Sequence, residues 1–171
     1  GPFCGRLSTV SPEGSIQASN VRAYFARIAQ RYDLANHLLS LGLDLLWRRH
    51  AARLIAARLP SRILDLATGS GDLALALQRA CPSASILGAD FCEPMLRVAQ
   101  SKGLQSLVVA DALHLPLPDH SFDAVTVAFG LRNMASWNGA LAEIHRVLKP
   151  GGTLLILDFG LPPPPWLIPY R

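Results

Sequence analysis

The sequence predicts an α/β fold, an open sandwich in which helices cover both faces of a mostly parallel sheet. Two observations lead to this prediction. Five short apolar runs follow one another between residues 60 and 160, and helical stretches separate most of them. The chain has 171 residues, half of them apolar, which is enough to bury one sizeable core.

The N-terminal part of the chain is expected to be helical after a flexible arm. Residues 1–18 are rich in Gly, Ser and Pro and predict the arm. A helix is expected from the capping residue Asn20. A second helix carries apolar residues at helical spacing, namely Leu43, Leu46, Trp47 and Leu54, with His50 on the same stripe. We therefore expect a helical substrate cover over 19–59, with His50 packed in the core rather than catalytic.

The α/β core is expected to span 60–160. The apolar runs predict five strands, at 63–67, 85–89, 106–109, 124–128 and 153–157. Helices are expected near 72–80, 94–102 and 136–148. Pro150-Gly151-Gly152 should end the last helix and turn the chain into the fifth strand, whereas the four successive prolines of the tail, 161–171, cannot join a sheet interior.

Composition excludes several classes of protein. The three cysteines, Cys4, Cys81 and Cys92, fit neither a disulfide framework nor, together with the five histidines, a metal-ligand spacing, so no metal is expected. No apolar run approaches the roughly 20 residues needed to cross a bilayer. The basic residues are scattered, so no nucleic-acid partner is expected despite a net charge of +4. The cysteines and the lack of a membrane-spanning run lead us to expect a cytoplasmic protein.

A glycine-rich turn stands where the first strand should meet a helix. The segment from Asp65 to Ala74 contains Gly69 and Gly71 in the pattern Gly-x-Gly-x-x-Ala. Glycines at this spacing let the backbone turn tightly and approach a ligand, in dinucleotide sites and in S-adenosylmethionine sites alike. A tight turn without a ligand is the plain alternative.

The charges beside the turn separate the two ligands. Asp65 precedes the glycines and Asp72 follows them. Two carboxylates would repel the pyrophosphate of a dinucleotide, whereas they would attract the sulfonium and ammonium of S-adenosylmethionine. The sequence therefore favours S-adenosyl-L-methionine as the cofactor.

Two further acids follow predicted strands. Asp90 lies about 20 residues after the glycines, where a carboxylate can hold ribose hydroxyls. Asp111 follows the third strand, where its carboxylate or the neighbouring amide can bind the adenine edge. Alternatively, Asp90 caps the next helix and Asp111 fixes a turn.

These segments resemble known methyltransferases. The stretch 65–72, Asp90, Asp111-Ala112 and the stretch 148–152 resemble the class I methyltransferase pattern. The stretches 31–36, 39–42 and 47–49, with Val127-Ala128-Phe129-Gly130-Leu131-Arg132-Asn133, resemble the menaquinone/ubiquinone biosynthesis C-methyltransferase family, from about residue 20 to 160.

The resemblance implies a Rossmann-like class I sandwich and a set of cofactor residues. By position these are Asp65, Gly69, Ser70, Gly71, Asp90, Phe91, Met95, Asp111, Ala112 and Ala128. Family members continue into two more strands. The chain is therefore expected to be C-terminally short, with 154–157 as an unpaired apolar edge.

The activity implied by the resemblance is C-methylation of a demethylated polyprenyl quinol. A ring carbon becomes nucleophilic when the adjacent phenol, with a pKa of about 10, is deprotonated. Arg132 is the candidate that stabilises the phenolate and Asn133 the one that orients it. Asp158, Tyr32, Asp33 or a water is the base. Another small-molecule methyltransferase, an NAD-dependent oxidoreductase and a truncated inactive cofactor-binding fragment are the alternatives.

A lipophilic substrate implies peripheral contact with a membrane. Four arginines of the second helix, Arg48, Arg49, Arg53 and Arg58, either face anionic lipid or form a solvated helix face. A homodimer is left open.

Overall fold

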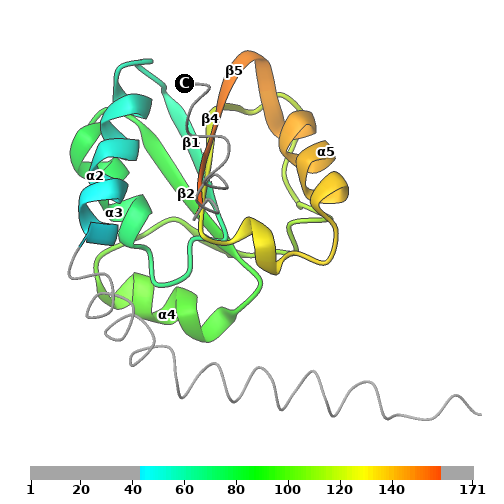
Figure 1. Cartoon of the computed structure of the whole chain (residues 1–171), viewed down its shortest axis with the longest axis horizontal. Coiled ribbons are helices and arrows are strands. Elements are labelled where there is room, and N and C mark those ends of the chain that lie inside the picture. Colours follow the sequence, from blue (N-terminus) through cyan, green and yellow to red (C-terminus); the bar gives the residue numbers. More distant parts are fainter. Residues whose placement is uncertain (1–42, 159–171) are drawn as a thin grey trace, which may run out of the picture.

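A five-stranded sheet lies at the centre of the molecule. The structure is a computed structural model that describes residues 43–158 (Figure 1). The strands are β1 (Arg62–Leu66), β2 (Ser85–Asp90), β3 (Leu107–Val109), β4 (Phe122–Ala128) and β5 (Leu148–Leu157). They follow the order β3-β2-β1-β4-β5, and every pairing is parallel. The carboxyl ends of the strands therefore meet along one edge.

Helices cover both faces of the sheet. They are α2 (Leu43–Ala56), α3 (Asp72–Ala80), α4 (Glu93–Ser101), the 3₁₀ turn η1 (Leu131–Asn133) and α5 (Trp137–Val147). One core cluster joins α2 and α3 to Ile63 and Ala124, and another joins α5 to Leu64 and Val125. Because neighbouring strand residues face opposite sides, α2 and α3 cover one face and α5 the other (Figure 1).

The predicted sheet and its crossover helices are confirmed. All five strands lie where the apolar runs place them, and the boundaries of α3, α4 and α5 differ from the predicted ones by at most one residue. The largest difference is at β5, because α5 ends at Val147 and Leu148 already pairs with Phe122. The pairing is irregular from there to Thr153, so Pro150-Gly151-Gly152 lies within an irregular strand start rather than at a helix end.

The buried face of α2 was predicted wrongly. Its buried residues are Asp44, Ala51, Ala52 and Ile55. Leu46 and Leu54 of the predicted stripe are 55% and 52% exposed, and His50 is exposed rather than packed in the core. The physical reason is close helix packing, because small alanines let α2 approach α3 and the sheet.

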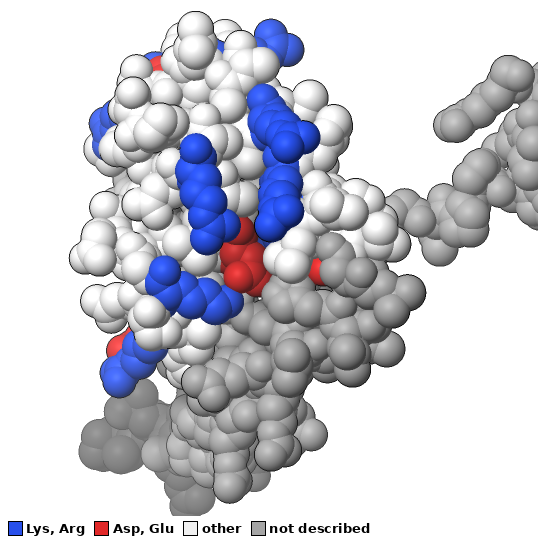
Figure 2. Space-filling model, turned by 90° about the vertical axis from the view of Figure 1, so that its left-hand side faces the viewer, with Lys and Arg blue, Asp and Glu red and all other residues white. Residues whose placement is uncertain are grey.

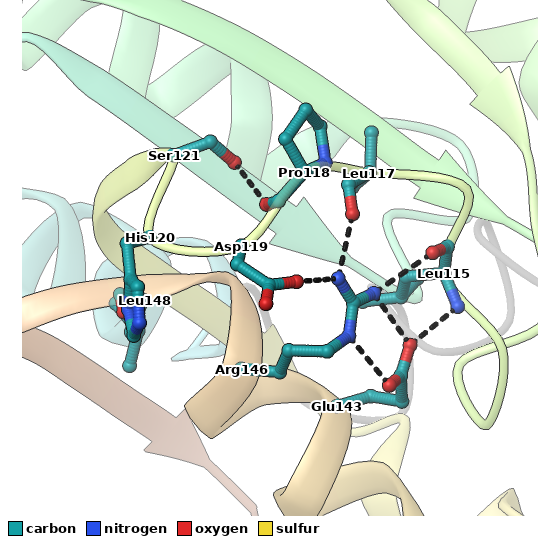
Figure 3. A network of polar contacts seen from close by, with 9 residues as sticks. All are labelled: Leu115, Leu117, Pro118, Asp119, His120, Ser121, Glu143, Arg146 and Leu148. Atoms are coloured by element: carbon teal, nitrogen blue, oxygen red, sulfur yellow. Dashed lines mark hydrogen bonds and ion pairs between the residues drawn. The ribbon is translucent and has the colours of Figure 1, made fainter.

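Arg146 of α5 fixes the long connection between β3 and β4 (Figure 3). Its guanidinium donates to the carbonyls of Leu115 and Leu117, to Asp119, and in a fork to both carboxylate oxygens of Glu143. Hydrogen bonds from Arg146 lower the pKa of Glu143 to about 2. The connection thereby packs on α5, on the face opposite α2 and α3.

The edge strand β5 pairs only with β4 among the described residues. Leu154 and Ile156 are exposed on it, as expected for an apolar edge. The flexible arm, the helix from Asn20, the part of the helical cover before Leu43 and the proline-rich tail lie outside the described residues.

Two neighbouring turns at the carboxyl ends of β1 and β4 pack tightly against each other. Ala67 and Phe129 both have positive φ, 54° and 57°. Gly130 lies so close to Ala67 that a Cβ added to it would meet the Ala67 Cβ at 2.4 Å. Glycine at position 130 is therefore a steric requirement of this contact.

Replacing Gly130 by Ala should destabilise the fold by about 1 to 3 kcal/mol, because the added methyl overlaps Ala67. Urea unfolding of the single variants Gly130→Ala and Ala67→Gly and of the double variant measures this. The double variant should recover most of the loss, since Gly tolerates the positive φ at position 67. Equal stability of Gly130→Ala and the wild type would refute the contact.

Candidate active site

A cavity of about 650 Å³ opens at the carboxyl ends of the strands. Its lining comes from α2, from the turns after β1, β2 and β4, from the segment after β3 and from η1. Ligands of open parallel sheets bind at this edge, beside the point where the strand order reverses. In this sheet the reversal lies between β1 and β4.

The carboxylate of Asp65 lies beneath the cavity rather than in its lining. It is 1% exposed and accepts hydrogen bonds of 2.6 Å from the hydroxyls of Thr68 and Thr126. Burial raises its pKa to about 6, against the effect of these two bonds and of the Arg48 charge. Asp65 thus ties the glycine turn to β4. Sequence reasoning missed both threonines, since hydroxyls carry no spacing signal.

Asp90 holds the glycine turn from the neighbouring strand. One carboxylate oxygen accepts the Gly69 N–H at 2.9 Å and the other accepts the Cys92 N–H at 2.8 Å. Burial raises its pKa, and these backbone bonds oppose the rise. A carboxylate can accept more hydrogen bonds than these two, and Asp90 lines the cavity. Its turn-fixing role and a ligand-binding role are therefore compatible.

Of three further residues in the glycine segment, one lines the cavity and two do not. Ser70 lines the cavity, 4% exposed. Gly71 does not, because it faces α4, where an added Cβ would meet Leu104 and Ala99. Asp72 also lies outside the lining, and its carboxylate binds the Lys102 ammonium at 2.9 Å. The prediction that the Asp72 charge attracts the ligand is therefore corrected, because the Lys102 ammonium offsets that charge.

The remaining predicted cofactor residues line the cavity. These are Phe91, Met95, Asp111, Ala112 and Ala128. The Asp111 carboxylate is 62% exposed and accepts the Leu113 N–H at 2.9 Å, which is the turn-fixing role considered as the alternative. Phe91 is 60% exposed, so an apolar ring stands open beside the cavity.

The predicted catalytic residues are brought together in part. Arg132 and Asn133 line the cavity from η1. Asp158, just past β5, lies outside the lining, and its Oδ1 is 3.5 Å from Nη1 of Arg132. Tyr32 and Asp33 lie outside the described residues.

Sequence reasoning also missed Asp44 and Arg48 in the cavity lining. The Arg48 side chain is 18% exposed, its Nε lies 3.8 Å from Oδ2 of Asp44, and its guanidinium lies 5.2 Å from the centre of the Phe129 ring. Their i, i+4 spacing on α2 is a sequence signal for the ion pair, and Arg48 also lies in the stretch 47–49 that carries the family resemblance. Arg48 therefore does not belong to the proposed lipid-facing arginines.

Arg49, Arg53 and Arg58 are exposed. Figure 2 shows the face of the molecule that carries α2 and α3, where Lys and Arg side chains lie around a small acidic group. No helix within residues 43–158 is long and apolar enough to span a bilayer. Over the same residues, no three His, Cys, Asp or Glu side chains gather as metal ligands.

Known structures of the same architecture identify the class. A SAM-dependent methyltransferase of Thermotoga maritima superposes with a TM-score of 0.63 at 27% identity, over 77% of this chain and 58% of that protein. The [4+2]-cyclase SpnF superposes with a TM-score of 0.55 at 32% identity, over 63% of this chain and 43% of that one. The fold is thus the Rossmann-like class I methyltransferase fold.

The chain belongs to the ubiE/COQ5 methyltransferase family, whose sequence profile matches residues 14–168. It is 56% identical over 146 residues to demethylmenaquinone methyltransferase of Thermus thermophilus, covering 82% of this chain and 66% of that protein. It is 44% identical over 156 residues to the ubiquinone/menaquinone biosynthesis C-methyltransferase UbiE of a Geobacter species, covering 86% and 66%. The chain thus spans slightly less than two thirds of the length of these relatives.

The raised pKa of Asp65 predicts how stability depends on pH. Its folded-state pKa of about 6 lies above its unfolded value, so this group makes the fold less stable as pH rises from about 4 to 6. Asp65→Asn lacks this effect. Between pH 4 and 7, urea unfolding should show the Asn variant gaining roughly 2 to 3 kcal/mol on the wild type.

Asp123 provides a control of opposite sign. A hydrogen bond from Lys149 lowers the pKa of Asp123, so its stabilising effect is lost as pH falls. Asp123→Asn should lose stability relative to the wild type as pH rises. If the stabilities of the wild type and of Asp65→Asn change equally with pH, the raised pKa of Asp65 is refuted.

Proposed function

We propose that the cavity binds S-adenosyl-L-methionine and that the chain transfers its methyl group to a ring carbon of a demethylated polyprenyl quinol in quinone biosynthesis. Family membership supports the reaction class. The relatives named demethylmenaquinone methyltransferase favour demethylmenaquinol as the acceptor, with a ubiquinol precursor as the other candidate.

The observation that carries the choice of cofactor is the hydrogen bond from the Gly69 N–H to Asp90. In a dinucleotide site the amides of this turn receive pyrophosphate oxygens. Here a carboxylate already occupies that amide, and Asp65 lies beneath the same turn. An anion would meet two negative groups and one donor fewer, whereas a ligand with a sulfonium and an ammonium would be attracted.

The cavity residues fit the adenosine half of this cofactor. Asp90 lines the cavity and retains acceptor capacity for ribose hydroxyls. Ala112 follows β3, where its amide can bind the adenine edge, and the exposed ring of Phe91 offers a stacking surface nearby. Ser70 and Met95 add contacts from the turn and from α4.

S-adenosylmethionine supplies an electrophilic methyl group, which passes to the ring carbon while the carbon–sulfur bond breaks and the ring proton leaves to a base. The task of the chain is to raise the electron density of that carbon. Arg132 would hold the phenolate oxygen beside it, because a guanidinium stabilises an anion at any physiological pH. Asn133 would orient the same oxygen, and Asp158 would position Arg132 through their contact.

Cofactor binding is tested by calorimetry with S-adenosylhomocysteine and NAD. Asp90→Asn keeps one carbonyl oxygen in place but loses an acceptor, so affinity for S-adenosylhomocysteine should fall about 10-fold or more. Glu93→Ala is the matched control, since its carboxylate pairs with Arg97 on the surface and lies outside the cavity lining. Binding of NAD in preference to S-adenosylhomocysteine would overturn the proposed cofactor.

Methyl transfer is tested with demethylmenaquinol and with a demethylated ubiquinol precursor. Arg132→Ala should lower kcat by roughly 100- to 1,000-fold, as expected for the loss of one stabilising donor. Its affinity for S-adenosylhomocysteine should stay within 2-fold of the wild type. Arg97→Ala, an exposed arginine of α4, is the control. If the chain binds S-adenosylhomocysteine but methylates neither quinol, the proposed reaction is wrong and the domain only binds the cofactor.

A further inference from the structure

Arg48 is a cation in the cavity lining whose Nε has no hydrogen-bond acceptor among residues 43–158. Its Nε is buried and makes no hydrogen bond to the part of the chain that the structure describes. Two acids lie near it: Oδ2 of Asp44 is 3.8 Å from the Nε, and Asp65 is close enough for the Arg48 charge to lower its pKa. The side chain is held in place by Asp44 and by the ring of Phe129. Besides the Nε, the guanidinium carries terminal N–H donors, and these donors are suited to an acceptor from a ligand.

The position of Arg48 along the sheet indicates which part of a ligand it meets. The adenosine-binding features, Asp90 and Ala112, follow β2 and β3. Arg48 instead lies against Phe129, which follows β4, and close enough to Asp65 in β1 to lower its pKa. Because the order is β3-β2-β1-β4-β5, a ligand whose adenine lies at β3 extends its other end toward Arg48.

The other end of S-adenosylmethionine is an amino acid, with a carboxylate and an ammonium. A guanidinium binds a carboxylate through two parallel N–H donors, and Arg48 has two terminal nitrogens on the side away from its Nε. Asp44 adds a carboxylate next to it, so the pair presents both charges to a zwitterion. Arg132, the other arginine of the lining, contacts Asp158 beyond β4 and is 45% exposed.

We infer that Arg48 binds the α-carboxylate of the cofactor and thereby determines which adenosyl compounds the site accepts. This inference rests on the proposed function, because it concerns the same cavity. It assigns a cofactor-recognising role to the first described helix, α2, which otherwise packs on α3 and the sheet.

The test compares ligands that differ in the carboxylate. Calorimetry is run on the full 171-residue chain with S-adenosylhomocysteine, its decarboxylated form and 5′-methylthioadenosine. Loss of a charge-assisted pair should weaken binding about 10- to 100-fold, so the wild type should prefer S-adenosylhomocysteine over the decarboxylated form by that factor. Equal affinities would overturn the inference.

Variants then assign the preference to Arg48. Arg48→Ala should bind S-adenosylhomocysteine and its decarboxylated form within 3-fold of each other, while 5′-methylthioadenosine, which has no amino acid, should bind as it does to the wild type. Arg49→Ala, its exposed neighbour on α2, should keep the full preference. A preference that persists in Arg48→Ala would assign the carboxylate to another residue and refute the inference.

Two controls separate this inference from folding and from the proposed function. If Arg48→Ala does not fold, Arg48→Lys keeps a cation beside Asp44 but loses the paired donors, and its preference should fall to an intermediate value; an unchanged preference would refute the role of the guanidinium. If the wild type binds none of the three adenosyl compounds, the proposed function fails. If it binds all three equally, only the inference about Arg48 fails.

Discussion

The buried carboxylate of Asp65 is the constraint on which the shape of the site depends. It lies in β1 opposite Thr126 of β4 and accepts the hydroxyls of Thr126 and Thr68, so one group joins two strands and the glycine turn. The fixed turn places the Gly69 N–H against Asp90 of β2. It also places Ala67 against Gly130, which begins the segment carrying Arg132 and Asn133. The strand ends that line the cavity are thus held by contacts that begin at one carboxylate.

This arrangement accounts for the ligand preference better than the glycine spacing does. Glycines permit the turn, but the acids around it decide the sign of charge that the turn accepts. The fold alone does not decide the reaction, since a [4+2]-cyclase has the same architecture. In the proposed function the reaction depends on side chains beyond the cofactor site, in η1 and just past β5. Those positions carry Arg132, Asn133 and Asp158, and the family profile spans all three.

The sequence was most informative where short-range patterns determine structure. The positions of strands and helices could be predicted from apolar runs and turn residues. The position of Asp90 in the cavity lining could be predicted from its distance to the glycines. Three predictions needed information that only the fold holds. The stripe of α2 that was predicted to be buried is exposed, because alanines rather than the larger residues pack against the sheet. Asp72 was assigned to the ligand because its partner Lys102 is 30 residues away. Arg48 was assigned to the surface because the spacing of residues along a helix does not show which other segments pack over a given side chain.

The most direct test of the account is hydrogen–deuterium exchange of the chain with and without S-adenosylhomocysteine. The account predicts slower exchange of amides in the segments that line the cavity, at 67–70, 90–91, 109–113 and 128–135. Exchange at the opposite edge of the sheet, at 81–85 and 118–121, should not change. Protection at that opposite edge, or no protection anywhere at saturating ligand, would contradict the claim that the strand ends joined through Asp65 form the cofactor site.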